Sequence, residues 1–346
     1  MGISVSKENV NPKNKVHQPH RQYINSNQVH AATKKKNDTI GEKELPNDIS
    51  QPQQRTISER IYHNIESSSY MLPKDDKEID RLHQEHFVTK ELLGFNIMTD
   101  ALKFLDFQND QLNVLDVCCG PATWLCETSL EYPNSKFIGV DMCSLWPQII
   151  KPVNLSFSEA NVLQGIPYPD KSFAFKTGEW NFVLSEIMRV LKDGGLLQCI
   201  ELDMKVYILL QLTQLSNHLQ KHVSYYKQMH NCCNLTNHYL VESFCSSFDL
   251  DASLGAKLDI MLTEKSELKI IQSEYREVPL GWGGPVGEAY LQVFQDTLEG
   301  LEPWLKQSLH VVEDQSYQEL MQKTKQSLVE SKSFMGLYAF LVVKPQ

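Results

Sequence analysis

Apolar positions from residue 112 onward alternate between two kinds of pattern. Short, nearly continuous apolar runs are typical of strands that are buried on both faces of a parallel sheet. These runs lie at 112–117, 136–141, 153–160, 172–175 and 196–202. Segments 122–132 and 179–195 instead repeat apolar residues at helical spacing, and Gly194 is expected to end the second helix. The second helix should bury one face, made of Trp180, Val183, Leu184, Ile187 and Leu191. The alternation predicts a doubly wound α/β sheet.

Outside this core the pattern is less regular. Before it, an extended piece stops at Pro73, and Asp75 or Asp76 should cap a helix. After it, 203–250 reads as mostly helical and is a candidate lid, while 267–280 and 334–343 supply two late strands. The helix after Pro73 should bury a loosely spaced stripe of Ile79, Leu82, His86, Phe87 and Leu93.

The composition divides the chain into a polar tail and one domain. Residues 1–55 are rich in Asn, Gln, Lys, His and Ser, and too poor in apolar residues to offset the cost of ordering, so we expect a disordered tail. Residues 56–346 should form the domain. Its expected parts are a helical cap (56–110), a sheet core (111–202), a helical lid (203–250) and C-terminal strands (251–346).

Charge and cysteine content restrict the partners. The net charge is −10; the tail holds nine Lys and Arg against five Asp and Glu, which leaves −14 for the remainder. An acidic body argues against a duplex nucleic-acid groove. The eight cysteines lack the spacing of a metal site and are expected to be cytosolic thiols. We therefore expect no metal and a cytoplasmic location, with membrane association or the nucleus as alternatives.

The first residues, Met-Gly-x-x-x-Ser, match the pattern for N-myristoylation at Gly2. One acyl chain holds a protein at a membrane only weakly, and Lys34–Lys36 would be a second signal. Alternatively, the three lysines are simply charged residues exposed to solvent, with no role in membrane binding. The tail thus raises the hypothesis of a weak membrane contact.

The segment "VLDVCCGPATW" (114–124) places small residues where a strand passes into a helix. The dinucleotide frame G-x-G-x-x-G fails, because it would need a small residue at Thr123. Small residues do recur at every second position, Cys118, Gly120 and Ala122, after Asp116. That spacing is the form used by S-adenosylmethionine enzymes. The alternative is a tight β–α turn in another α/β fold.

The next strand ends at Asp141, 21 residues beyond Gly120. A carboxylate in this place can accept both hydrogen bonds of a ribose diol. An acidic residue at a strand end is common in α/β proteins, so Asp141 supports a cofactor site only in combination with the loop.

Later segments carry a family resemblance. "EANVLQGIPYPDKSF" and "EIMRVLKDGGLLQCIE" resemble motifs of class I S-adenosylmethionine-dependent methyltransferases. "SSYMLPKDDKEIDRLHQEH", "REVPLGWGGPVGE" and "KSFMGLYAFLVVKP" resemble a fungal group of these enzymes related to velvet-complex regulators of secondary metabolism. The resemblance covers about residues 58–346. It implies a Rossmann-like seven-stranded sheet, mostly parallel with an antiparallel last strand, and methyl transfer from S-adenosyl-L-methionine to an unidentified small-molecule or protein acceptor.

The resemblance also implies roles for individual residues. The loop after Asp116, at Cys118, Cys119 and Gly120, would pack against the methionyl part of the cofactor. Asp141 would bind the ribose, with Met142 beside the adenine, and Asn161 with the backbone of Val162 would bond the adenine amino edge. Tyr70 and Arg81 would close over the cofactor, although a surface ion pair is an equal alternative for Arg81. His83, His86 and Glu201 are candidate bases by residue type alone.

Two departures from the family pattern qualify this reading. Cys118 and Ala122 replace glycines; a positive φ at Cys118 would cost about 1–2 kcal/mol, whereas Ala122 should be mild. The chain also runs from Phe175 through three residues into the next predicted helix, so a segment near the transferred methyl group is missing. The alternative function is therefore a catalytically impaired regulatory protein that acts through a protein partner. The loop "PLGWGG" (279–284) would line a substrate cavity or form a structural turn.

Overall fold

The structure is a computed structural model that describes residues 54–64, 70–177, 182–208, 245, 251–264, 268–311 and 313–346. The chain divides into two compact units, residues 1–39 and 40–346, and every described residue belongs to the second. The predictions for Gly2 and Lys34–Lys36, and most of the predicted lid, lie outside the described residues.

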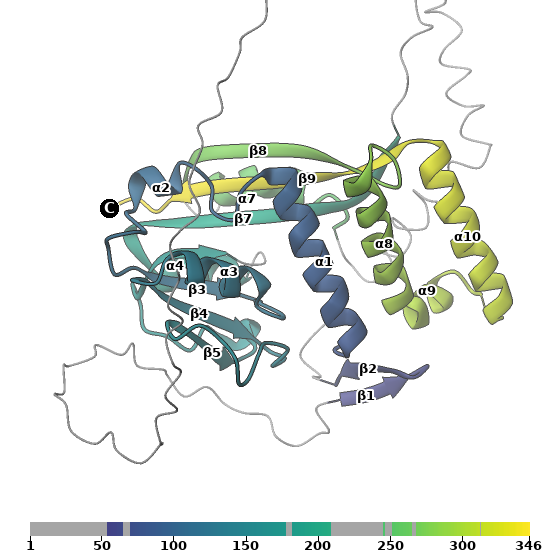
Figure 1. The fold of residues 1–346 in the computed structure, drawn as a ribbon, viewed down its shortest axis with the longest axis horizontal. Helices are drawn as coiled ribbons and strands as arrows, with labels where there is room; N and C mark the ends of the chain where they lie inside the picture. The colour runs from purple at the N-terminus through teal and green to yellow at the C-terminus, as the bar shows by residue number, and fades with distance from the viewer. Residues whose placement is uncertain are drawn as a thin grey trace, which may run out of the picture. The chain divides into compact units, whose positions relative to one another are not determined.

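A seven-stranded sheet organises the described residues (Figure 1). In spatial order its strands are β5 (Leu155–Glu159), β4 (Lys136–Asp141), β3 (Asn113–Val117), β6 (Phe173–Thr177), β7 (Leu191–Ile208), β9 (Ser333–Val343) and β8 (Lys269–Pro279). The neighbours from β5 to β7 pair in parallel, and β9 is antiparallel to both β7 and β8. The predicted α/β fold with a parallel sheet is confirmed. The direction of winding reverses between β3 and β6, and ligands bind at such switch points.

Helices and two further strands complete the described part of the chain. The helices are α1 (Asp76–Leu93), α2 (Ala101–Phe104), α3 (Thr123–Glu131), α4 (Phe182–Val190), α7 (Leu258–Glu264), α8 (Pro285–Gly300), α9 (Glu302–Ser308) and α10 (Asp314–Glu330), with short 3-10 turns η1 (Val162–Gln164) and η2 (Gly255–Lys257). Strands β1 (Gln54–Ile57) and β2 (Arg60–His63) form an antiparallel pair. None of the described helices combines the length and the apolar character needed to cross a membrane.

The central strands of the sheet are buried on both faces, which explains their continuous apolar runs. Val114 of β3 packs in a core with residues of α1, α3 and α8, whereas the adjacent Leu115 packs in a second core with residues of α4 and α7. Leu196 and Leu197 of β7 divide between the same two cores. Side chains alternate across a strand, so a run that is apolar at every position fits this two-sided burial.

Helix α1 begins as predicted, but it buries a different face. The Asp75 carboxylate accepts a hydrogen bond from the Glu78 backbone N–H at 3.1 Å, which caps the first turn. The expected stripe was wrong at Phe87, whose side chain is 51% exposed. The buried residues of the helix are Glu78, Arg81, Val88 and Leu93. Two of these four residues are charged, so apolar spacing in the sequence does not indicate that they are buried.

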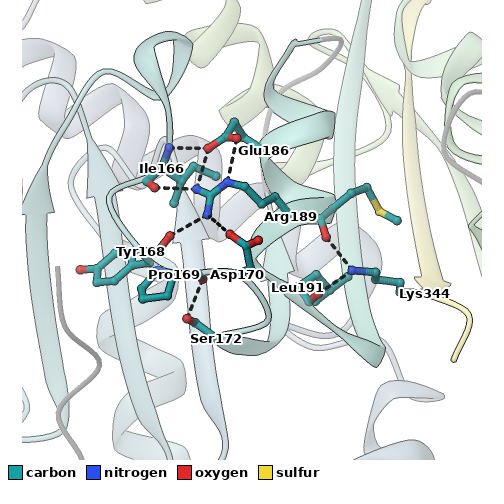
Figure 2. A network of polar contacts seen from close by, with 10 residues as sticks. Ile166, Tyr168, Pro169, Asp170, Ser172, Glu186, Arg189, Leu191 and Lys344 are labelled. Atoms are coloured by element: carbon teal, nitrogen blue, oxygen red, sulfur yellow. Dashed lines mark hydrogen bonds and ion pairs between the residues drawn. The ribbon is translucent and has the colours of Figure 1, made fainter. Parts of the chain in front are cut away.

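Arg189 of α4 binds the segment from Ile166 to Asp170, which precedes β6 (Figure 2). Its guanidinium donates to the carbonyls of Ile166 and Tyr168, each at 2.8 Å, and to the carboxylates of Glu186 and Asp170. Glu186 in turn accepts from the Ile166 N–H at 2.9 Å. The helix thereby holds the loop that leads into the central strand β6, a structural role.

Three predicted boundaries need correction. Helix α4 ends at Val190, not at Gly194, and Leu191 already belongs to β7. Strand β7 continues to Ile208, six residues into the predicted lid, and β1 begins at Gln54 inside the predicted tail. Trp180 lies outside the described residues. Gly194 instead takes a left-handed φ of 72° beside the pairing with the C-terminal strand, where its N–H donates to Lys344 at 2.9 Å.

Candidate functional site

The loop between β3 and α3 has a left-handed residue at every second position. Cys118, Gly120 and Ala122 have φ values of 60°, 50° and 61°. The small-residue spacing in the sequence therefore reflects a backbone requirement. Cys118 is exposed and carries the strain anticipated for a non-glycine residue. Ala122 was expected to be a mild replacement, but this expectation was wrong for the backbone: the residue is fully buried and shares the same strained conformation.

Asp141 fastens this loop to the end of β4. One of its carboxylate oxygens accepts from the Gly120 N–H and the other from the Cys143 N–H, both at 2.9 Å. Burial raises the pKa of Asp141, and these hydrogen bonds oppose that effect only in part. The residue thus shapes the loop before any ligand is considered, and each oxygen keeps a lone pair for a further donor.

Cys119 and Gly139 show how closely the loop packs on the sheet. Cys119 is buried, and a Cβ placed on Gly139 would lie 2.8 Å from its sulfur and 2.7 Å from Leu125 Cδ1. Burial raises the pKa of the Cys119 thiol well above its usual value. Its side chain therefore belongs to the core, and it can offer a ligand only its backbone.

A cavity of about 360 Å³ opens beside the loop. It is lined by α1, the end of β3, Trp124 of α3, the middle of β7 and Tyr290 of α8. Of the predicted cofactor residues, Asp116 and Cys118 line it, and Cys119, Gly120, Asp141, Met142, Asn161, Val162 and Tyr70 are not among the lining residues. The predicted site is therefore in two parts: this cavity, and the ends of β4 and β5.

The second part lies along neighbouring strand ends. Asp141 pairs in register with Glu159, so Met142 and Asn161 follow adjacent parallel strands at one edge of the sheet. The Asn161 side chain caps η1 by accepting from the Leu163 N–H at 3.0 Å. Val162 packs in the core, and Met142 is half-buried.

The N-terminal residues proposed to close over the cofactor have other surroundings. Tyr70 is 38% exposed, and its carbonyl oxygen lies 2.6 Å from His63 Nε2. The alternative for Arg81, a surface ion pair on a helix, is confirmed as an ion pair and wrong about the surface: the side chain is buried and bonds Glu78 and Glu85 of the same helix, each at 2.8 Å. Burial, together with the nearby Glu85 carboxylate, raises the pKa of the Tyr290 hydroxyl well above its usual value. Because Glu85 and Tyr290 line the cavity, Arg81 supports the cavity wall from behind.

The structure adds three polar residues to the candidate base His86, namely Glu127, Lys90 and Asn96, which residue type alone did not single out. The Glu127 carboxylate of α3 accepts hydrogen bonds from His86 and Lys90 of α1 and from the Asn96 side chain, at 2.7, 2.8 and 3.1 Å. His86, Lys90 and Asn96 all line the cavity, and the Asn96 side-chain oxygen is buried without a hydrogen-bond partner among the described residues. Only the paired helical spacing of His86 and Lys90 could have pointed to them.

The three candidate bases separate clearly. His86 and Glu201 line the cavity, whereas His83 does not and lies 2.6 Å from the Thr123 hydroxyl.

The "PLGWGG" loop is also absent from the cavity lining. Gly281 and Gly283 have φ values of 79° and 78°, and the Trp282 indole donates a hydrogen bond to the Ser333 carbonyl at 2.6 Å. That loop is a structural turn between β8 and α8.

The charged side chains that line the cavity carry a net negative charge. Glu85, Asp116 and Glu201 contribute carboxylates. The positive charge of Lys90 is matched by Glu127, and Arg81 is shared by Glu78 and Glu85. A cationic group with an apolar body fits this wall, because Phe95, Trp124 and Tyr290 lie beside the carboxylates.

Known proteins resemble the chain over part of its length. No family model matches. The N-methyltransferase verN of Clonostachys rogersoniana is 28% identical over 164 residues, which cover 43% of this chain and 56% of the relative. The secondary metabolism regulator laeA of Coprinopsis cinerea is 25% identical over 159 residues, covering 43% and 39%. A demethylmenaquinone methyltransferase of Listeria welshimeri is 34% identical over 105 residues, covering 26% and 44%. The chain thus spans about two fifths to just over half of the length of these relatives.

Among solved structures, the YcgJ protein of Bacillus subtilis has a TM-score of 0.40 at 16% identity, over 71% of this chain and 97% of that one. A phosphoethanolamine N-methyltransferase of Haemonchus contortus in complex with S-adenosyl-L-methionine has a TM-score of 0.36 at 13% identity, over 76% and 57%.

Proposed function

Because the chain is a relative of the class I S-adenosylmethionine-dependent methyltransferases and of the laeA regulator, we propose that it binds S-adenosyl-L-methionine and transfers its methyl group to an acceptor. The acceptor is a small molecule or a protein, and verN, an N-methyltransferase, favours nitrogen as the atom methylated.

The observation that carries the proposal is the β3–α3 loop. It alternates left-handed residues, is tied to Asp141 through the Gly120 N–H, and borders a cavity with an acidic and aromatic wall. Left-handed residues let backbone come close to a ligand, and the N-terminus of α3 adds a positive dipole end beside it.

The residues present fit this cofactor. The backbone of residues 118–120 would hold the methionyl part, and Asp141 would accept from the ribose with its remaining lone pairs. Met142, Asn161 and the Val162 backbone would contact the adenine. The acidic wall suits the sulfonium charge, and the cofactor would supply an already activated methyl group. The chain's own task is then to orient the acceptor and exclude water.

The finer fold assignment belongs to the same proposal. We infer that the seven strands, with β9 antiparallel, form the Rossmann-like sheet of this family.

A second candidate function rests on the connection after β6. That strand ends at Thr177 and α4 begins at Phe182, so only four residues intervene where the family has a longer loop beside the methyl group. A chain shortened there would bind the cofactor without turnover and act through a protein partner, as a regulator.

Calorimetric titration of the full chain with S-adenosylmethionine and with its demethylated product tests the proposal. Micromolar binding is expected, and Asp141→Ala should abolish it, since it removes both the ribose acceptor and the tie to the loop. Asp106→Ala is a matched control, because Asp106 caps only its own exposed turn. No binding at millimolar cofactor would contradict the proposed methyl transfer and leave only a regulatory relative that does not bind the cofactor.

A further inference from the structure

The Glu127 cluster differs from an ordinary surface ion pair. Its carboxylate accepts from two residues of α1 and from Asn96, and thereby joins α1 to α3 beside the cavity. Burial would raise the pKa of Glu127, but the hydrogen bonds from His86, Lys90 and Asn96 outweigh it and lower the pKa to about 2. Glu127 is therefore ionised at neutral pH and can only accept hydrogen bonds.

This partner fixes the state of His86. An ionised carboxylate 2.7 Å from Nε2 requires the proton on that nitrogen, which leaves Nδ1 as the basic atom of the neutral ring. Nδ1 makes no hydrogen bond to the described residues. Burial lowers the pKa of His86, and Glu127 offsets this only in part, so the ring is neutral near pH 7.

The surroundings of His86 contain the groups that a cationic acceptor needs. Glu85 and Thr89 from α1, Asp116 from β3 and Glu201 from β7 share the cavity with the imidazole. Lys90, already paired with Glu127, lies near the ring, and His83 lies on the same helix; both lower the pKa of His86. A neutral base in an acidic cavity is suited to a substrate that enters protonated and must lose a proton before it reacts.

We propose that His86 is the proton acceptor of the transfer reaction, held in its reactive tautomer by Glu127, and that the methyl acceptor is a primary or secondary amine bound as its ammonium ion. This inference rests on the proposed function. It names His86 as a residue that touches the substrate and Glu127 as a positioning residue.

One proton and one methyl group are transferred in the proposed reaction. The ammonium nitrogen gives one proton to Nδ1 of His86, which becomes an imidazolium stabilised by the Glu127 carboxylate. The freed lone pair of the amine forms the N–CH₃ bond while the S–CH₃ bond breaks. The sulfur keeps that electron pair and becomes a neutral thioether, and the product amine leaves with the new methyl group as an ammonium ion. The imidazolium then returns its proton to water.

Nitrogen-15 NMR of the full chain, labelled at histidine, tests the ground state. The His86 signals are assigned by their loss in His86→Gln. We expect a neutral ring protonated at Nε2 with a pKa below the usual value of about 6.5. In Glu127→Gln the pKa should fall further, because the charge that favours the imidazolium is gone, and the tautomer should become mixed. A proton on Nδ1, or a pKa unchanged by Glu127→Gln, would overturn the assignment.

Transfer of a labelled methyl group from S-adenosylmethionine to a pooled panel of primary and secondary arylalkyl amines tests the reaction. We expect product from the panel, with kcat rising as the pH rises through the pKa of His86. His86→Gln should lower kcat by about 100-fold or more and remove that rise. His83→Gln is the matched control on the same helix, outside the cavity; it should keep kcat and its rise with pH, with the midpoint at the same or a slightly higher pH because His83 lowers the pKa of His86.

The possible results separate the two levels of inference. Cofactor binding without methylation of any amine overturns the amine and His86 assignments and leaves the proposed function standing. Amine methylation with an unchanged pH profile in His86→Gln overturns the role of His86 alone. Absence of cofactor binding overturns the proposed function itself.

Discussion

The substitution Cys118→Gly should stabilise the protein, although it removes a side chain. Cys118 is exposed and has a left-handed φ of 60°. A residue with a Cβ in that conformation costs about 1–2 kcal/mol relative to its right-handed form. Glycine relieves this cost but loses about 0.5–1 kcal/mol through the greater freedom of the unfolded chain. The expected net gain is about 1 kcal/mol.

Ala122 provides an internal comparison, because it has almost the same φ but is fully buried. Ala122→Gly relieves the same strain and also gives up a buried methyl group, worth about 0.8 kcal/mol. Its net effect should be close to zero. Cys118→Ala keeps the Cβ and should give no gain, which separates backbone strain from any effect of the sulfur.

Urea unfolding at pH 7, followed by circular dichroism, measures all three variants against the parent chain. The midpoint should rise for Cys118→Gly alone, with an unchanged slope, and the melting temperature should rise by about 2 °C for a domain of this size. A loss of stability in Cys118→Gly, or an equal gain in Cys118→Ala, would refute the claim that the loop stores strain at this position.

Three further predictions concern packing and charge. Gly139→Ala should destabilise by about 1–3 kcal/mol in urea unfolding, since the new Cβ would lie 2.7 Å from Leu125 Cδ1; a neutral result would mean that the loop can move away. Arg81→Ala should cost about 3–5 kcal/mol, because Glu78, fully buried, loses its partner; an effect below 1 kcal/mol would argue that Glu78 becomes protonated. Stability should fall as the pH drops from about 4.5 to about 2, since Glu127 is ionised through that range only when folded; Glu127→Gln should show a shallower decline in urea midpoint over that window, and an identical decline would contradict the assigned pKa.

Much of the fold could be predicted from the sequence, because burial on both faces leaves a strong signal. The run at 136–141 coincides with β4, and the Asp75 cap fixes the start of α1. Helix ends were less predictable. The amphipathic pattern of α4 continues through Leu191, but that residue pairs with Phe173 in the sheet, and strand pairing prevailed over helical periodicity. The helices α8 to α10 between the two late strands were not predicted at all.

The site was predictable only where it depends on the backbone. The alternate small residues from Cys118 to Ala122 announce left-handed positions, and the structure has them. Which side chains line the cavity depends on the tertiary packing of α1 against α3 and β7, and this packing cannot be deduced from local sequence patterns. Arg81 could not be distinguished from a surface residue, since burial of a charged pair leaves no periodic signal. His86 and His83 likewise differ only in which side of α1 meets the cavity.

Calorimetric titration of the full chain with S-adenosylmethionine tests whether this loop and Asp141 bind the cofactor. We expect micromolar binding that is lost in Asp141→Ala, kept in Asp106→Ala and strengthened or unchanged in Cys118→Gly. Failure of the folded parent chain to bind at millimolar cofactor, or equal affinity in Asp141→Ala, would contradict this assignment of the site.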